Sequence, residues 1–313
     1  MYEPLGTADF IPLPLYIRGK VRDVFNLGDQ LLIVATDRIS AFDVVFEELI
    51  PQKGIILNSI SAFWFEQTKP IIKNHVISTN PAHYPSILSP YANPLAGRSM
   101  LVKKIEMLPV ECIVRGYLEG SALKEYREKQ TVGSIPMPPG LRQADRLPEP
   151  VFTPSTKEET GHDVNISFEQ FKEIVGPDLA RKVREKSLEL YRYAASYTEK
   201  RGMIVADTKF EFGLDHGCLM IADELLTPDS SRFWDLTEYE PGRPQKSFDK
   251  QYLRDWLETQ NWDKNPPPPH LPQHVIEATA ARYREAYERL TGEKLIFEGD
   301  DERKHSHDYL PSH

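Results

Sequence analysis

At 313 residues the chain can bury one large core or two modest ones, and its 40% hydrophobic and 27% charged content is ordinary for a globular protein. A net charge of −9 argues against a nucleic-acid-binding surface, and no apolar run approaches the length that spans a bilayer. Two cysteines are too few for a disulfide framework, and the start MYEPLGTADF lacks a signal-peptide pattern, so a cytoplasmic protein is expected.

Strands are predicted to dominate the first hundred or so residues. The stretch YIRGKVRDVFNLGDQLLIVAT, residues 16–36, predicts a strand, a turn at residues 26–29 and a second strand. SMLVKKIEML, residues 99–108, predicts a third. Residues 131–156 carry many prolines and little periodicity, so a long ordered loop is expected there.

Helices are predicted in the second half of the chain. Apolar residues recur at helical spacing from Leu179 to Ala194, with Gly202 as a stop, and SFDKQYLRDWLETQ predicts another helix with Ser247 as its N-cap. After four prolines, a last helix is expected to place inward Ile276, Ala280, Tyr283, Tyr287 and Leu290. These stripes indicate packing, and the histidines of the polar ending, residues 299–313, are expected to belong to a loose tail.

The stretch VADTKFEFGLDHGCLMIADE, residues 205–224, predicts an acidic hairpin. Alternation puts Asp207, Lys209 and Glu211 on one face of its first strand. If paired residues have numbers that sum to an even value, Asp223 emerges on that face too. Carboxylates about 5 Å apart repel by roughly 3 kcal/mol, so clustering them calls for a cation such as Lys209 or a hard divalent metal. A half-exposed strand with a solvated charged face is the alternative.

Two stretches carry cations beside glycine. RGKVRDVF, residues 18–25, places Lys20 and Arg22 on one strand face next to Gly19, where phosphates could bind, although this stretch alone favours a solvated hairpin. In VRGYLEGSALKEY, residues 114–126, an arginine closes a strand and a Gly-Ser pair opens a helix, which is typical of an anion pocket. The alternative there is a Ser N-cap beside a surface ion pair.

Further cations follow the acidic hairpin. TPDSSRFWD could turn Arg232 toward the same cleft, and Lys250 and Arg254 lie four apart on a predicted helix, where like charges need something negative between them. Glu258, one turn further, could be the simple partner of Arg254. ATDRISAFDVV and FTPSTKEETGHDVNIS match no nucleophile triad or zinc pattern. Carboxylates for a metal together with several cationic sites suit nucleotide-dependent group transfer.

Seven stretches in order closely resemble one family: GKVRDVF, ATDRISAFDVV, IPQKGIILNSIS, VECIVRGYLEGSALKEY, STKEETGHDVNIS, DTKFEFGLD and ADELLTPDSSRFWD. The family is phosphoribosylaminoimidazole-succinocarboxamide synthase, the SAICAR synthetase of purine biosynthesis, and the resemblance spans residues 18–257. It implies a two-lobed α+β fold. A kinase-like, antiparallel β-rich nucleotide lobe would occupy residues 1–108, a larger α+β lobe residues 109–265, and a Pro-rich linker, a C-terminal helix packed on the body and a polar tail residues 266–313.

The resemblance also implies the chemistry. ATP, L-aspartate and carboxyaminoimidazole ribotide (CAIR) would give the succinocarboxamide SAICAR, ADP and phosphate, through an acyl phosphate. The expected partners are these small molecules, with no nucleic acid, membrane or obligatory protein partner. Mg²⁺ is the implied metal.

The resemblance assigns roles to particular residues. The implied catalytic residues are Lys209, Glu211 and Asp223, of which Glu211 and Asp223 would hold Mg²⁺. The implied ATP-binding residues are Gly19, Lys20, Arg22, Lys103, Met107 and Lys209. The implied substrate-binding residues are Asp43, Arg115, Ser121, Arg232, Lys250 and Arg254, and STKEETGHDVN would help close over aspartate.

Two other classes compete with a ligase. A kinase on a related nucleotide-binding scaffold would need a catalytic Asp with a nearby Asn, and an HRD stretch of that kind is absent from the sequence. In a non-enzymatic nucleotide-binding module, the acidic hairpin would have no functional role. Phosphate release that requires all three substrates would separate the ligase from both.

Overall fold

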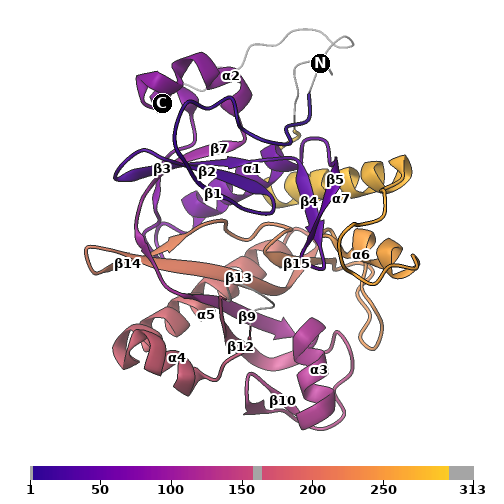
Figure 1. The fold of residues 1–313 in the computed structure, drawn as a ribbon. Coiled ribbons are helices and arrows are strands. Elements are labelled where there is room, and N and C mark those ends of the chain that lie inside the picture. The colour runs from indigo at the N-terminus through magenta and orange to yellow at the C-terminus, as the bar shows by residue number, and fades with distance from the viewer. Residues whose placement is uncertain (1–2, 158–163, 296–313) are drawn as a thin grey trace.

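The computed structural model describes residues 3–157 and 164–295 (Figure 1). Its first layer is a five-stranded antiparallel sheet in the order β1-β2-β3-β7-β6. The strands are β1 (Leu15–Arg18), β2 (Arg22–Asn26), β3 (Gln30–Ala35), β6 (Val76–Ser78) and β7 (Ser99–Lys103). The single strand predicted before the turn at residues 26–29 is wrong, because the amide of Gly19 donates to the carbonyl of Arg22 at 2.8 Å and reverses the chain.

A separate hairpin follows the first sheet. It joins β4 (Arg38–Ala41) to β5 (Val44–Leu49) through a two-residue turn. Both turn residues, Phe42 and Asp43, have positive φ, at 51° and 65°. This mirror-image turn matches the twist of the flanking strands, and it places Asp43 at the hairpin tip. Helix α1 (Lys53–Gln67) comes next in the chain.

The second layer is a six-stranded antiparallel sheet built around the long strand β13 (Met203–Asp215). Its other strands are β8 (Glu106–Met107), β9 (Val110–Tyr117), β12 (Arg146–Thr156), β14 (Cys218–Ala222) and β15 (Ser231–Asp235). The predicted loop over residues 131–156 is therefore partly wrong, since it also contains β10 (Thr131–Val132) and β11 (Ile135–Pro136). Its prolines are tolerated because β12 lies at the edge of this sheet, with β9 as its neighbouring strand.

Helices cover both layers. They are α2 (Ala92–Leu95), α3 (Gly120–Lys129), α4 (Phe168–Val175), α5 (Pro177–Glu199), α6 (Gln251–Glu258) and α7 (Gln273–Thr291), with short 3₁₀ helices η1 (Pro81–His83) and η2 (Ser86–Tyr91). The helix predicted to end before Gly202 is confirmed as α5, which packs on β9, β12 and β13. The predicted cap Ser247 is wrong: α6 starts at Gln251, whose amide donates to Asp249 at 2.7 Å.

Helix α7 lies beside α1 and buries Tyr283, Tyr287 and Leu290, as its stripe predicted (Figure 1). Apolar side chains of α1, β9, β13, α5 and α7 share one core, so the α+β class is confirmed. The division at residues 108 and 265 stays a prediction, and β8, just before the first boundary, already pairs with β13. Among the described residues no helix is long and apolar enough to cross a membrane. The predicted tail, residues 299–313, lies outside them.

Candidate active site

A cavity of about 470 Å³ opens between the β1–β2 turn, the β4–β5 hairpin and the start of α6, and we call it the charged cleft. Its lining residues are Gly19, Lys20, Val21, Arg22, Ser40, Ala41, Phe42, Asp43, Lys209, Glu224, Asp229, Lys250 and Arg254. Eight of these carry a charged side chain. Such a lining suits a highly charged ligand far better than an apolar one.

The acidic hairpin reaches this cleft by a different route from the one predicted. Glu211 pairs with Ala222, so paired numbers sum to an odd value and the even register is wrong. Strict alternation would then turn Asp223 to the opposite face. Asp223 follows the last residue of β14, however, and its φ of 64° redirects the side chain. Its Oδ2 lies 2.8 Å from Nη2 of Arg22, so a left-handed residue at the strand end brings the acid to the cation.

The acids and cations of this region keep one another ionised. Lys209 Nζ lies 2.8 Å from Glu211 and 3.0 Å from Glu111. Burial alone would lower the pKa of Lys209, but the carboxylates of Glu211 and Asp223 outweigh it and raise that pKa. Burial alone would raise the pKa of Asp223, but Arg22 and Lys209 outweigh it and hold that pKa well below its usual range. Lys209 and Asp223 are therefore both charged at neutral pH.

Two carboxylates of this region have the chemistry of a magnesium site. Glu211 and Asp223 offer carboxylate oxygens, the donors that Mg²⁺ prefers. Within residues 3–157 and 164–295, no group of three His, Cys, Asp or Glu side chains is placed to hold a metal ion alone. The second oxygen of Glu211 contacts Lys157. The donor set thus fits a Mg²⁺ ion that takes its remaining ligands from phosphate and water.

A second cationic centre, which we call the Asp207 clamp, joins Arg115 and Arg232. Arg115 donates to Asp207 at 3.1 Å, to Ser121 at 2.9 Å and to Thr153 at 3.0 Å. Arg232 donates to the same Asp207 oxygen. Two guanidinium groups thus share one carboxylate near the first turn of α3, which favours an anion.

The simpler interpretation of this stretch is wrong. Arg115 is only 4% exposed, so it makes no surface ion pair. Ser121 does not cap α3, because the side chain of Glu119 accepts from the amide of Gly120. Gly120 itself has a φ of 58°, and a Cβ there would lie 2.7 Å from Arg232 Nη2. Glycine at this position therefore lets the guanidinium approach the helix start.

Beneath the charged cleft lies a third group, which we call the Asp229 cluster. Asp229 Oδ2 lies 2.8 Å from Lys53 Nζ and 3.1 Å from Lys250 Nζ. Glu258, the alternative partner predicted for Arg254, pairs with Lys264 at 2.7 Å instead, so that alternative is wrong. Lys250 and Arg254 put two positive charges at the start of α6, and the nearby negative group is Asp229, from the TPDSSRFWD stretch.

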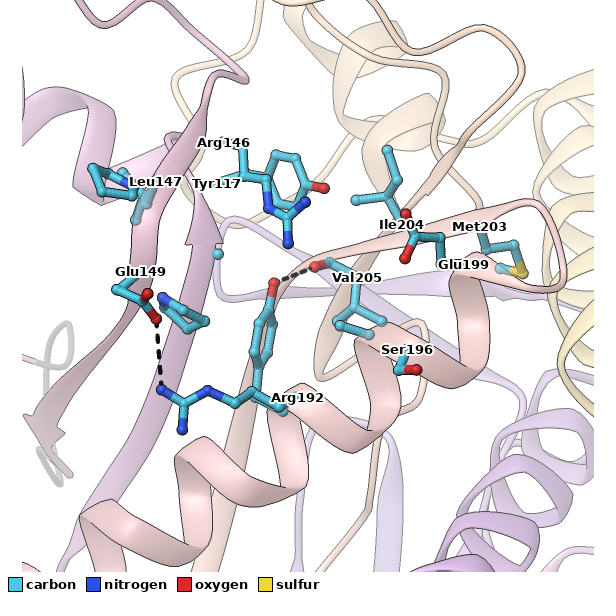
Figure 2. Close-up of a pocket in the computed structure, with 15 residues that line it drawn as sticks. Tyr117, Arg146, Leu147, Glu149, Arg192, Ser196, Glu199, Met203, Ile204 and Val205 are labelled. Atoms are coloured by element: carbon cyan, nitrogen blue, oxygen red, sulfur yellow. Dashed lines mark hydrogen bonds and ion pairs between the residues drawn. The ribbon is translucent and has the colours of Figure 1, made fainter.

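A cavity of about 340 Å³, which we call the back cavity, lies between α5 and strands β9, β12 and β13 (Figure 2). Tyr191 on α5 donates to the carbonyl of Val205 at 2.7 Å, and Arg192 lies 3.7 Å from Glu149. Among the described residues that line this cavity, none was predicted as a site residue. Its charged lining residues, Arg146, Glu149, Arg192 and Glu199, are exposed, and the rest of its lining is mainly Tyr, Leu, Pro, Ile and Val.

Comparisons with known proteins decide the family. Residues 15–269 match the family model described as SAICAR synthetase. A phosphoribosylaminoimidazole-succinocarboxamide synthase of Pelobacter propionicus is 54% identical over 296 residues, covering 94% of this chain and all of the relative. The chain belongs to the SAICAR synthetase family. A synthase of the same name from Desulfosudis oleivorans is 56% identical over 286 residues, covering 91% of this chain and 98% of the relative.

Solved structures agree with the family assignment. SAICAR synthase from Saccharomyces cerevisiae, complexed with SAICAR, has a TM-score of 0.84 and 46% identity and covers 93% of this chain and 98% of its own. A type-2 SAICAR synthetase in complex with ADP has a TM-score of 0.67 and 27% identity, covering 91% of this chain and all of its own. The implied SAICAR-synthetase-like α+β fold is therefore confirmed.

The fold brings most of the predicted site residues together. The predicted residues that line the charged cleft are Gly19, Lys20, Arg22, Asp43, Lys209, Lys250 and Arg254. Glu211 and Asp223 are bonded to residues of that lining, and Arg115, Ser121 and Arg232 form the Asp207 clamp. The stretch STKEETGHDVN lies partly outside the described residues, which stop at residue 157 and resume at 164.

Two predicted ATP-binding residues do not join this set. Lys103 pairs with Asp215 at 2.8 Å and lines a different cavity, of about 370 Å³, that Lys69 and Lys73 also line. Met107 is 39% exposed and pairs with Gly213 across β8 and β13. Their roles at adenine stay predictions.

Sequence reasoning missed several charged residues of the cleft and its floor. They are Lys53, Glu224 and Asp229. Lys53 is fully buried because α1 packs apolar side chains on nearly every side. The signal for it was a lysine directly ahead of the apolar run GIIL, and the signal for Asp229 was an acid three residues before Arg232 in an otherwise buried segment.

Proposed function

We propose that this chain is the ATP-dependent ligase that joins L-aspartate to CAIR, giving SAICAR, ADP and phosphate in de novo purine biosynthesis. The observation that carries the proposal is 54% identity, over the full length of the relative, to a phosphoribosylaminoimidazole-succinocarboxamide synthase. The SAICAR and ADP complexes of two similar structures support small-molecule substrates of this kind. We also propose that the enzyme is cytoplasmic.

The ATP phosphates bind, in this proposal, against the β1–β2 turn. Gly19 lets backbone approach them, and Lys20 and Arg22 supply positive charge from the same cleft wall. Lys209, ionised by its carboxylate neighbours, neutralises charge beside them. Glu211 and Asp223 would hold Mg²⁺, which supplies further positive charge to the triphosphate when bound.

CAIR binds with its phosphate at the Asp207 clamp. The guanidinium groups of Arg115 and Arg232 offer paired N–H donors that suit a phosphate, and Ser121 adds a hydroxyl at the start of α3. In this proposal Lys250 and Arg254 bind carboxylates in the cleft, and Asp43, which pairs with Lys20, binds the amino group of the imidazole. Residues 155–165 are proposed to help close over L-aspartate.

The reaction requires activation of an unreactive carboxylate. A carboxylate oxygen of CAIR attacks the γ-phosphorus of ATP, and the bond from that phosphorus to the β-phosphate oxygen breaks. ADP departs, and the CAIR carboxylate has become an acyl phosphate. The amine of aspartate attacks the acyl carbon and loses a proton, and phosphate departs with the former carboxylate oxygen. Both steps gather negative charge, so fixed cations such as Lys209 and Arg22 are the main catalytic contribution of this chain.

The test is substrate dependence followed by isotope transfer. Purified protein with Mg²⁺ and ATP should release phosphate only when CAIR and aspartate are both present. With ¹⁸O in the CAIR carboxylate, one labelled oxygen should appear in the released phosphate. Absence of phosphate release with all substrates present would contradict the ligase, and release without label transfer would contradict the acyl phosphate. A kinase or a binding module would satisfy neither requirement.

A further inference from the structure

Tyr283 brings the C-terminal helix α7 to the floor of the charged cleft. This helix begins at Gln273, after the last residue, 269, that the family model matches. Tyr283 is fully buried, and its hydroxyl donates to Oδ1 of Asp229 at 2.5 Å. A residue in a helix beyond the matched segment therefore bonds directly to a residue that lines the cleft.

Asp229 uses both of its oxygens in this arrangement. Oδ1 accepts from Tyr283, and Oδ2 lies 2.8 Å from Lys53 and 3.1 Å from Lys250. Lys53 also lies over the Tyr283 ring, 5.6 Å from its centroid. Burial and the ammonium of Lys250 lower the pKa of Lys53, so the carboxylate of Asp229 has to stay aligned with both amines. The tyrosine hydroxyl fixes that alignment by holding the carboxylate oxygen that the lysines do not contact.

Lys250 is the lysine of the cluster that lines the charged cleft. It is the N-cap of α6 and lines the cleft together with Arg254, one helical turn away. Its side chain is 11% exposed, whereas that of Lys53 is fully buried. Helix α7 also holds α6 in place, because Arg282 stacks on the Tyr252 ring at 4.0 Å.

We propose that Tyr283 is a positioning residue: through Asp229 it fixes the ammonium of Lys250 in the charged cleft, where that ammonium binds an anionic oxygen of a substrate. The substrate part of this inference rests on the proposed function. The geometric part, that Tyr283 holds Lys250, does not.

The kinetic test uses Tyr283→Phe, which removes the hydroxyl and keeps the ring against Lys53. The KM for CAIR or for aspartate should rise about tenfold while kcat changes less than twofold, as expected for lost ground-state binding. Tyr287→Phe is the matched control, since its hydroxyl donates to Glu293, at 3.3 Å, just beyond the end of α7 and away from the Asp229 cluster. Its KM values should equal those of the unmodified protein.

The same substitution in a Lys250→Met background distinguishes positioning of Lys250 by Tyr283 from a general loosening of the fold. If Tyr283 acts through Lys250, Tyr283→Phe adds no further rise in KM there. A full additional rise, or an unchanged KM for every substrate in the single variant, would overturn the inference. If the unmodified protein forms no product at all, the proposed function fails instead.

A chemical footprint tests the geometry without turnover. Acetic anhydride should acetylate Lys250 several-fold faster in Tyr283→Phe than in the unmodified protein, because a released ammonium becomes more exposed. Lys69, whose side chain is 58% exposed, is the internal reference and should react equally in both. Equal acetylation of Lys250 in the two proteins would overturn the inference, even for a variant too unstable to assay.

Discussion

The charged cleft and the back cavity lie on different parts of one fold and have comparable volumes, about 470 and 340 Å³. Their charges are held very differently. In the cleft, the side chains of Arg22 and Asp223 are 22% and 20% exposed and lie 2.8 Å apart. At the back cavity, those of Arg192 and Glu149 are 57% and 80% exposed and lie 3.7 Å apart (Figure 2).

Cavity volume alone therefore does not identify the candidate active site of this fold. Taking charges out of water is expensive, so a chain that does so repeatedly in one place must compensate them with partners. In the cleft those partners come from distant segments: Arg22 and Asp223 are 201 residues apart, and Lys53 and Asp229 are 176 apart. The exposed pair of the back cavity involves little desolvation and requires no such compensation.

The largest effect is expected at Asp223, the acid that pairs with the cleft residue Arg22. Asp223→Asn should lower kcat about 10³-fold, because the amide has no negative charge for metal or cations. The backbone should tolerate it, since Asn adopts the left-handed conformation readily and φ here is 64°. Steady-state kinetics beside a circular dichroism spectrum would check this. A folded variant with near-normal turnover would remove Asp223 from the mechanism.

The next effect concerns stability rather than catalysis. Lys53→Met should lower the free energy of unfolding by about 3 kcal/mol, because it leaves Asp229 buried with one ammonium instead of two. Lys69→Met is the control, since Lys69 pairs with Glu66 in an exposed position. Urea unfolding of both variants would check the contrast. Equal losses would mean that burial does not distinguish the cleft charges.

A smaller effect is expected at the Asp207 clamp. Arg115→Lys should raise the KM for CAIR about 10- to 100-fold, because one ammonium cannot reproduce the contacts of a guanidinium to Asp207, Ser121 and Thr153. The KM for ATP should change little. A pair of saturation curves would check it, and an unchanged KM for CAIR would exclude Arg115 from the ribotide site.

The smallest effect is expected at the back cavity. Arg192→Ala should change turnover less than twofold and the free energy of unfolding by no more than about 0.5 kcal/mol, as for most exposed substitutions. The same assays would check both values. A large loss of activity would break the comparison, because the exposed charges would then matter as much as the buried ones.

Much of the site could be predicted from the sequence, because local motifs name the residues. Lys209 and Glu211 alternate onto one strand face, and Arg115 precedes a helix start, and both features depend only on neighbours in the chain. The fold class followed from the same motifs through the resemblance. The helix over residues 179–194 was predicted correctly because its apolar period is long and regular.

The remainder depends on turn geometry and contacts that side-chain periodicity does not encode. The register of β13 with β14 is set by a two-residue turn at His216 and Gly217, whose φ values are 48° and 79°, and Asp223 reaches Arg22 through a single left-handed residue. The strand β12 was missed because its prolines are acceptable only at a sheet edge, which a sequence does not display. The stripe of α7 correctly predicted burial of Tyr283, but not its hydrogen bond to a residue 54 positions away.

The central claim is that the ligase reaction takes place in the charged cleft, against Lys209, Glu211 and Asp223. A crystal structure of the protein with ADP, Mg²⁺ and CAIR would test it most directly. We predict the ADP phosphates beside Arg22 and Lys209, with the ribotide phosphate at the Asp207 clamp. Ligands found instead in the back cavity, between Tyr117 and Arg192, would contradict the account.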